Sequence, residues 1–456
     1  MKNPCHLPLL KVRWIHIIAI GPTGIDEKRP IRNPFSSNVL TVVKSEKICE
    51  SSIRVSLVTK YKSNIFRQNI GIFEAKKQIL INFTKKNAVK TKTIVSILSV
   101  WWLVACQHAP QKTLTETPKD SLKTEYATLF AVRYYDEYKQ IAVTNRWSND
   151  TLYYYLTKNP DVHVPENGTK LTMPLDNIAI TSCTHISYFD LLHETDRIKA
   201  MASPELAYNS EIRKRIATGR TADIGDAFSL NTEKVILQRP QIVMMNDFNG
   251  ENLSAKKLKE LGIPVVFINE WQENSPLARA EWIKMIGALL DKEDLADSIF
   301  NAVKERYDSI KNANTPQKTT ILSGNYFHEI WNVPGGKSYM GAFFCDAGFD
   351  YLYKNNPSTE SIKLSMEAIF EQFHNADIWI GCPANTLDEL TVLDTRYTLL
   401  KSVKNGAVFN YKKRNTPTGG NDFWETGVVR PDIVLEDLSR IARKQYDSLY
   451  FMNKLE

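Results

Sequence analysis

Histidine, carboxylate and hydroxyl side chains are the groups that could build a metal site or a catalytic centre in this chain. His185 and His328 stand in loop-like sequence with Asp247 and Glu329 as potential neighbours, and such a set could bind a bare divalent metal. His185 could alternatively be an axial ligand of haem. Ser182 lacks the G-x-S-x-G nucleophile elbow, and H-E-x-x-H and phosphate-loop motifs are absent. We therefore expect no catalytic residue, and a buried or solvated histidine is the default interpretation rather than a metal site.

Cys106 follows a sequence that is typical of a lipoprotein export signal. Four lysines at 85, 86, 90 and 92 precede an uncharged apolar run, residues 93–104, which is short for a membrane-spanning helix. The run ends in Leu103-Val104-Ala105-Cys106, which resembles a lipobox, where the cysteine thiol accepts a diacylglycerol. We predict a signal peptide over 85–106 and a polar tether over 107–125. The lipid on Cys106 would anchor the protein to a membrane of the cell envelope, facing the periplasm or the outside, with the choice of membrane left open.

Residues 1–84 are unexplained, because a signal peptide does not normally have so long a segment in front of it. They are aperiodic, and we expect translation to begin near residues 70–85; peptides from residues 1–60 in the native precursor would contradict this. The basic charge also lies here, because residues 1–92 hold 18 Lys+Arg and 5 Asp+Glu, leaving 40 and 46 in residues 93–456. The mature chain is therefore acidic, and nucleic acid is not a predicted partner.

Three cysteines remain in the mature chain, Cys183, Cys345 and Cys382. They have no C-x-x-C spacing and form neither a zinc motif nor a disulfide framework. Buried small apolar side chains are the favoured interpretation, although a bridge between Cys345 and Cys382 stays open.

The elements that must position any site alternate between strands and helices. Residues 126–174 predict a small β-rich entry segment, because aromatic and β-branched residues alternate there. Residues 175–290 then alternate between short apolar strands and helices, and the same pattern restarts over residues 315–456. This order predicts an α/β fold with two Rossmann-like lobes whose parallel sheets are covered on both faces.

A long helix is predicted between the two lobes, in the segment 291–314. Apolar residues recur at helical spacing from Leu295 to Ile310, with charged residues between them. Such a helix would be about 30 Å long at 1.5 Å per residue, and it would permit only small closing motions of the lobes.

The order of these pieces resembles the helix-linked class of periplasmic binding proteins, over roughly residues 175–446. The segments that carry the resemblance are 178–182 (IAITS), 225–226 (GD), 231–236 (NTEKVI), 240–243 (PQIV), 261–265 (LGIPV), 365–369 (SMEAI), 376–380 (ADIWI) and 430–432 (RPD). The resemblance implies a monomeric protein that captures an iron–siderophore, haem or cobalamin and delivers it to an ABC permease dimer with its ATPase. No cofactor other than the lipid on Cys106 is implied.

One glutamate per lobe is expected to dock on the permease. Segments 231–235 and 364–369 each place a glutamate, Glu233 or Glu367, near the start of a short helix. In the family, glutamates at these positions pair with permease arginines, whereas the simpler explanation is that each only favours its helix dipole. Alternatives to the whole scheme are a surface scavenger that docks on no permease and a protein that binds bare divalent metal.

The ligand is expected between the lobes, at the loops that leave the carboxyl ends of the parallel strands. Aromatic faces there suit a flat macrocycle or catecholate rings, and glycines permit a close approach to the backbone. The candidate ligand-binding residues are Ser182, Thr184, His185, Tyr188, Asp226, Phe228, Asp247, Trp271, Trp331, Gly336, Tyr339 and Trp424.

Overall fold

The computed structural model describes residues 117–247 and 252–456. The predictions on residues 1–84, the signal peptide, the lipidated Cys106 and the first part of the tether lie outside the described residues. Within the two described ranges, no helix combines the length and the apolar character needed to cross a membrane.

The described chain begins with a five-stranded sheet, which we call the accessory sheet. Its strands follow the order β1-β2-β3-β4-β5 and are antiparallel except for the parallel β4–β5 pair. The strands are β1 (Asp120–Ser121), β2 (Phe130–Tyr134), β3 (Tyr138–Thr144), β4 (Thr151–Thr157) and β5 (Thr169–Thr172). The turn between β2 and β3 contains Asp136 and Glu137, two exposed residues that suit a turn.

The first lobe is built on a parallel sheet in the order β12-β11-β6-β7-β8. These strands are β6 (Ile178–Ile180), β7 (Ile198–Met201), β8 (Ala222–Asp223), β11 (Ile242–Met245) and β12 (Val265–Phe267). Successive residues of β11 alternate between two cores, since Ile242 and Met244 join one cluster and Val243 and Met245 join another. Both faces of the sheet are therefore covered. The helices are α4 (Thr184–Leu191), α5 (Ser210–Ala217), α6 (Thr232–Gln238) and α7 (Leu253–Glu260), with a β9–β10 hairpin (Gly225–Asp226, Ser229–Leu230).

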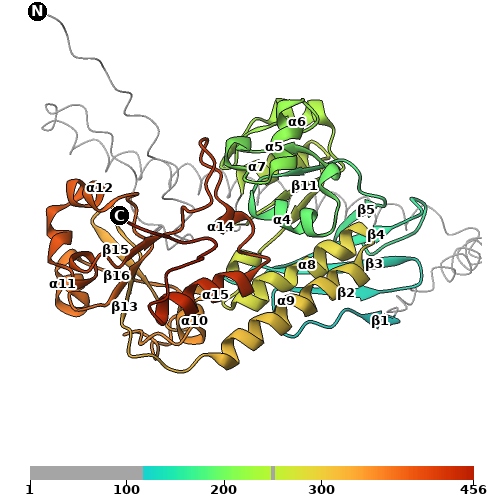
Figure 1. The fold of residues 1–456 in the computed structure, drawn as a ribbon. Helices are drawn as coiled ribbons and strands as arrows, with labels where there is room; N and C mark the ends of the chain where they lie inside the picture. Colours follow the sequence, from blue (N-terminus) through green and yellow to red (C-terminus); the bar gives the residue numbers. More distant parts are fainter. Residues whose placement is uncertain (1–116, 248–251) are drawn as a thin grey trace, which may run out of the picture. The chain divides into compact units, whose positions relative to one another are not determined.

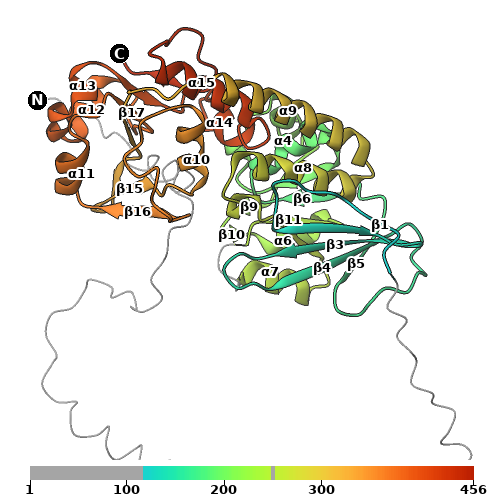
Figure 2. The ribbon, with the colours of Figure 1, turned by 90° about the horizontal axis from the view of Figure 1, so that it is seen from below.

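Two helices, α8 (Pro276–Leu290) and α9 (Glu293–Ala313), follow the first lobe and lie side by side (Figures 1 and 2). Almost every residue of α8 is buried, because it packs between the accessory sheet and the first lobe in one continuous core. The Phe130 and Trp282 rings meet there edge to face, with centroids 5.1 Å apart. Helix α9 is amphipathic, and its buried Tyr307 packs into the core of the second lobe.

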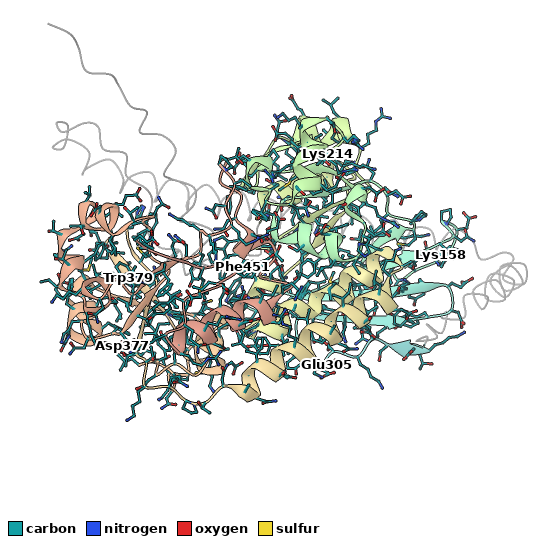
Figure 3. All side chains as sticks on the ribbon, viewed as in Figure 1. Lys158, Lys214, Glu305, Asp377, Trp379 and Phe451 are labelled. Carbon is teal, nitrogen blue, oxygen red and sulfur yellow. The ribbon has the colours of Figure 1, made fainter. Side chains whose placement is uncertain are left out.

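The second lobe has a four-stranded sheet, β13-β17-β18-β19, which is parallel except at its last strand. Its strands are β13 (Ile321–Ser323), β17 (Ile378–Ile380), β18 (Val408–Asn410) and β19 (Asn453–Lys454). An antiparallel sheet of β14 (Tyr326–Phe327), β15 (Ile330–Pro334) and β16 (Ser361–Leu364) lies in the same lobe. Its helices are α10 (Tyr339–Asp346), α11 (Met366–Phe373), α12 (Leu387–Leu393), α13 (Lys401–Lys404), α14 (Asp422–Glu425) and α15 (Pro431–Ala442). Trp379 and Phe451, labelled in Figure 3, are both fully buried in its core.

The predicted fold class is confirmed: two α/β lobes with parallel sheets, a long helix leading into the second, and a small N-terminal sheet. One detail of the second lobe differs, because Trp331, expected in a loop, lies in β15. Cys345 and Cys382 are both free, the first exposed and the second buried, so the pairing left open by the sequence is not made.

Candidate ligand-binding site

A cavity of about 600 Å³ lies between the two lobes. This volume is within the range of small-molecule sites. Its walls come from loops at the carboxyl ends of parallel strands, including Ser182 after β6, Asn246 after β11, Asn325 after β13 and Gly381 after β17. Because parallel strands present their carboxyl ends at one edge of each sheet, loops of the two sheets meet across one space.

Seven of the twelve predicted residues line this cavity. The lining residues are Ser182, Thr184, Asp226, Phe228, Trp271, Tyr339 and Trp424. Trp271 approaches from the first lobe, while Tyr339 and Trp424 belong to the second, so aromatic surface faces the cavity from both lobes. Phe228 is 56% exposed.

The other five predicted residues do not line the cavity. His185 is fully buried in α4, neither ring nitrogen has a hydrogen-bond partner, and burial lowers the pKa of His185 to about 3. A neutral, enclosed imidazole of this kind is a core side chain. Tyr188 is also buried, and its hydroxyl donates to the backbone oxygen of Arg279 at 2.8 Å.

The remaining three fill structural positions. Trp331 is completely buried, and its indole N–H donates to the backbone oxygen of Ser323 at 2.9 Å. Gly336 lies against backbone, since an added Cβ would stand 2.3 Å from the Tyr353 oxygen. The Asp247 carboxylate accepts a hydrogen bond from the Asn145 amide at 2.8 Å.

No group of three or more histidine, cysteine or acidic residues in the described part of the chain has the geometry of a metal site. His328 and Glu329 occupy left-handed backbone positions, with φ of 49° and 64°, in the turn between β14 and β15. Neither residue belongs to the cavity wall.

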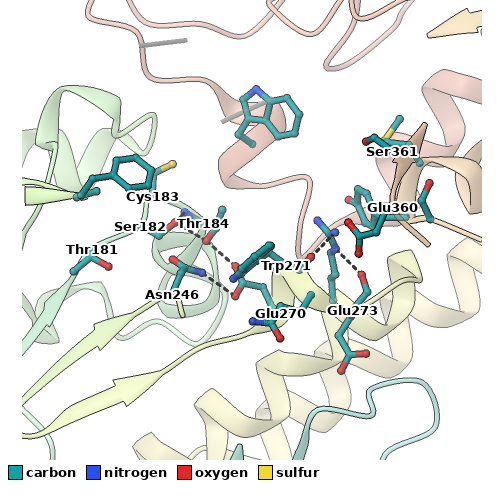
Figure 4. A pocket seen from close by; sticks show the side chains of 18 of the residues that line it. Thr181, Ser182, Cys183, Thr184, Asn246, Glu270, Trp271, Glu273, Glu360 and Ser361 are labelled. Carbon is teal, nitrogen blue, oxygen red and sulfur yellow. Dashed lines mark hydrogen bonds between the residues drawn. The ribbon is translucent and has the colours of Figure 1, made fainter. Parts of the chain in front are cut away.

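Glu270 forms a buried polar cluster at the wall of the cavity. Thr184 Oγ1 donates to its carboxylate at 2.9 Å and Asn246 Nδ2 donates at 3.4 Å, as the dashed lines in Figure 4 show. Burial raises the pKa of Glu270 to about 7, while the hydrogen bond from Thr184 and the charge of Arg279 oppose this rise. The side chain therefore exchanges a proton near neutral pH inside the candidate site.

Arg279 is the cation nearest to this cluster. Its guanidinium stands over the Tyr339 ring, 3.8 Å from the centroid, and donates to the backbone oxygens of Trp271 at 2.7 Å and Glu273 at 3.1 Å. Arg279 thus joins an aromatic residue of the second lobe to a cavity loop of the first. Burial lowers the pKa of Arg279 without neutralising it, because an arginine stays charged in proteins.

Replacing Glu270 by glutamine is expected to stabilise the protein increasingly as the pH rises. Because the pKa of Glu270 is raised, the folded protein keeps a proton that the same carboxyl in the unfolded chain releases above its ordinary pKa of 4.5. The free energy of unfolding of the wild type therefore decreases as the pH rises from 4.5 to about 7. The excess stability of Glu270→Gln over wild type should grow by about 3 kcal/mol between pH 4.5 and 8. Urea denaturation at several pH values measures it, with Glu305→Gln at an exposed position as the matched control. A difference that stays flat over this range would contradict the assignment.

Contacts of Glu425 connect the second lobe to the first beside Trp424. The buried Glu425 carboxylate accepts the backbone N–H groups of Tyr208 at 2.7 Å and Asn209 at 2.9 Å, and burial raises the pKa of Glu425 to about 8. The hydroxyl of Ser187 also donates to the Glu425 backbone oxygen. These bonds hold the Trp424 segment against the first lobe, in addition to the α8–α9 connection.

Most of the cavity wall was not predicted from the sequence, and three of the missed residues matter most for the chemistry of the site, namely Trp147, Glu270 and Arg279. Trp147 comes from the accessory sheet, outside the predicted lobes, while Glu270 and Arg279 flank or follow Trp271 by a few residues. Glu270 carried a usable signal, because it directly precedes a predicted cleft residue after a buried strand. Arg279 lies inside a helix, and nothing in its local sequence distinguishes it from a solvated arginine.

Comparison with known proteins supports the architecture. The model of the family described as periplasmic binding protein matches residues 182–415, just over half of the chain. An uncharacterised lipoprotein of Methanocaldococcus jannaschii is 29% identical over 355 residues, covering 70% of this chain and 82% of that protein. A second uncharacterised lipoprotein of the same organism is 25% identical over 258 residues, covering 53% of this chain and 65% of that protein.

Similar solved structures include a periplasmic haem-binding protein of Vibrio cholerae, with 14% identity and a TM-score of 0.45, covering 57% of this chain and 99% of that one. A triscatecholate siderophore-binding protein from Bacillus subtilis has 16% identity and a TM-score of 0.45, covering 62% and 98%. The family match, unlike these structural likenesses, settles the class of protein, and it confirms that this is a binding protein rather than an enzyme. The chain belongs to the periplasmic binding protein family.

Proposed function

We propose that this protein captures a metal chelate, an iron–siderophore, haem or cobalamin, and delivers it to an ABC permease. The observation that carries the proposal is the cavity of about 600 Å³ with aromatic side chains facing it from both lobes. Lobes that contribute to one cavity can hold a ligand too large for either alone. Haem and a siderophore are the ligands for which two proteins of similar fold are named, and the lipoprotein relatives agree with an anchor at Cys106.

The charge of the cavity favours an uncharged or cationic chelate. Among the described lining residues Arg279 is the sole basic one, and its guanidinium is engaged by Tyr339. Asp226 and Glu360 are acidic lining residues, and the buried Glu270 adds a partial charge near neutral pH. A strongly anionic chelate would meet repulsion here, whereas a neutral or positive one would not.

Titration of the protein from residue 107 onward tests the proposal. Ferrioxamine B, cyanocobalamin, haemin, ZnCl2 and MnCl2 are the probes, with tryptophan fluorescence and calorimetry as readouts. We expect saturable binding, micromolar or tighter, of at least one chelate and none of the bare metals, because a cavity with Trp271 and Trp424 offers rings rather than metal ligands. A response to bare metal alone, or to no probe, would contradict the proposal. The Trp331→Phe variant, which alters a tryptophan outside the cavity, is the control for the fluorescence signal.

Delivery would use Glu233 and Glu367. Both carboxylates are exposed in the first turn of a short helix, Glu233 on α6 of the first lobe and Glu367 on α11 of the second. Each helix is capped by a side chain, Asn231 or Ser365, that accepts the backbone N–H three residues further on, so each glutamate stands on a fixed helix end. One exposed acidic group per lobe is the arrangement that a permease dimer with two basic sites would recognise.

A further inference from the structure

The turn between β3 and β4 of the accessory sheet is built around Asn145. The Asn145 side-chain oxygen accepts the backbone N–H groups of Trp147 at 2.9 Å and Ser148 at 3.2 Å. Its backbone N–H donates to Asp150, and its backbone oxygen accepts from Asn149, which adopts a left-handed conformation. The turn that carries Trp147 therefore has a defined conformation of its own.

The same turn is hydrogen-bonded to the loops that surround the ligand cavity. Asn145 Nδ2 donates to Asp247 at 2.8 Å, and the Arg146 backbone N–H donates to the Gln272 side chain at 2.8 Å. The Arg146 guanidinium also donates to the Gln272 backbone oxygen at 3.0 Å. Asp247 and Gln272 lie in the loops after β11 and β12, so the accessory sheet is bonded to the part of the first lobe that forms the cavity.

Trp147 itself lies at the cavity and keeps much of its ring exposed. It lines the cavity, its ring centroid is 4.9 Å from that of Trp271 with 49° between the planes, and 44% of its surface is exposed. A tryptophan that served only to attach the sheet would be buried, as Trp282 of α8 is in the core that α8 shares with the accessory sheet. The two indoles instead form an inclined pair, and both line the cavity.

We propose that Trp147 is a ligand-binding residue, and that the accessory sheet completes the site by holding it beside Trp271 against a flat conjugated part of the chelate. The inference rests on the proposed ligand-binding function. It extends the site into the accessory sheet, which precedes residues 182–415, the part of the chain that matches the family, and so assigns a role in specificity to a sheet that the family match does not include. The two rings would bind a macrocycle or aromatic ring by stacking and apolar contact, and they would contribute little to the affinity for an aliphatic chelate.

Binding by the Trp147→Ala variant tests this inference, with cyanocobalamin and haemin as conjugated probes and ferrioxamine B as an aliphatic one. We expect Trp147→Ala to weaken the conjugated probe that wild type binds by about tenfold, and Trp147→Phe to weaken it less, because a smaller ring still stacks. Tyr135→Ala is the matched control: it removes one ring of the stacked Tyr135–Tyr138 pair at the opposite hairpin of the same sheet, away from the cavity. Its affinity should equal that of wild type, and thermal unfolding of each variant reports whether the sheet remains folded.

Two results would overturn the inference while leaving the proposed function intact. One is equal affinity of wild type and a folded Trp147→Ala variant for cyanocobalamin or haemin. The other is binding of ferrioxamine B alone by wild type. Failure of all three probes with wild type would instead remove the proposed function, and the inference with it.

Discussion

Reversal of the two exposed glutamates that we propose for docking, Glu233→Lys with Glu367→Lys, is expected to abolish delivery of the ligand and to leave its capture unchanged. Neither side chain lines the cavity, so affinity should match wild type. A permease that presents basic groups to both positions would meet like charges, which cost several kcal/mol at an interface. We expect uptake to fall by at least about a hundredfold.

The measurement compares two readouts for the same variant. Uptake of radiolabelled ligand by cells that carry the variant in place of the native protein gives delivery, and titration of the purified variant gives affinity. A control with the same change in net charge is Glu211→Lys with Asp388→Lys, which alters acidic residues in the first turns of α5 and α12, one per lobe. Normal uptake by the docking variant would favour a scavenger that needs no permease, whereas equal loss in both variants would indicate a general charge effect.

The arrangement of strands and helices could be predicted because it follows from periodicity. The strand Ile178–Ile180 is an uninterrupted apolar run, as a strand buried on both faces requires, and Glu293–Ala313 repeats apolar residues at helical spacing. Strand β15 was not predicted, because its Asn332 and Pro334 are typical of loops. The alternation of the buried residues Trp331 and Val333 was the available signal for a strand there.

The candidate site was only partly accessible from the sequence, since a cavity depends on which loops meet in three dimensions. Loops after parallel strands could be named, and residues such as Ser182 and Trp271 do line the cavity. The sequence did not separate a loop tryptophan from a core tryptophan, as Trp271 and Trp331 illustrate. The place of Trp147 in the site could not be predicted for another reason. Its position beside Trp271 depends on how the accessory sheet packs on the first lobe. Hydrogen bonds between residues distant in sequence, such as Asn145 and Asp247, fix that packing.

That packing depends on a buried carboxylate, that of Glu281 on α8. Its oxygens accept the backbone N–H groups of Glu125 at 2.9 Å, Tyr126 at 2.8 Å and Ala127 at 2.8 Å, in the segment between β1 and β2 of the accessory sheet. Consecutive amides that point to one side cannot all find partners in a strand, and an anion satisfies them together. Lys284 lies 3.4 Å from the same carboxylate and balances its charge.

Replacement of Glu281 by alanine is therefore expected to lower the free energy of unfolding by about 3 to 5 kcal/mol, because three backbone N–H groups lose their acceptor at once. Glu281→Gln, which keeps one acceptor oxygen, should lose less. Urea denaturation followed by tryptophan fluorescence measures the change, and Glu305→Ala on the exposed face of α9 is the control, expected within about 0.5 kcal/mol of wild type. If Glu281→Ala were as stable as that control, the carboxylate would not be what holds the accessory sheet. The expected result is lower stability of Glu281→Ala, with hydrogen exchange rising first at residues 125–129, where the sheet is attached to α8. The position of Trp147 at the cavity would then depend on Glu281, a residue with no exposed surface.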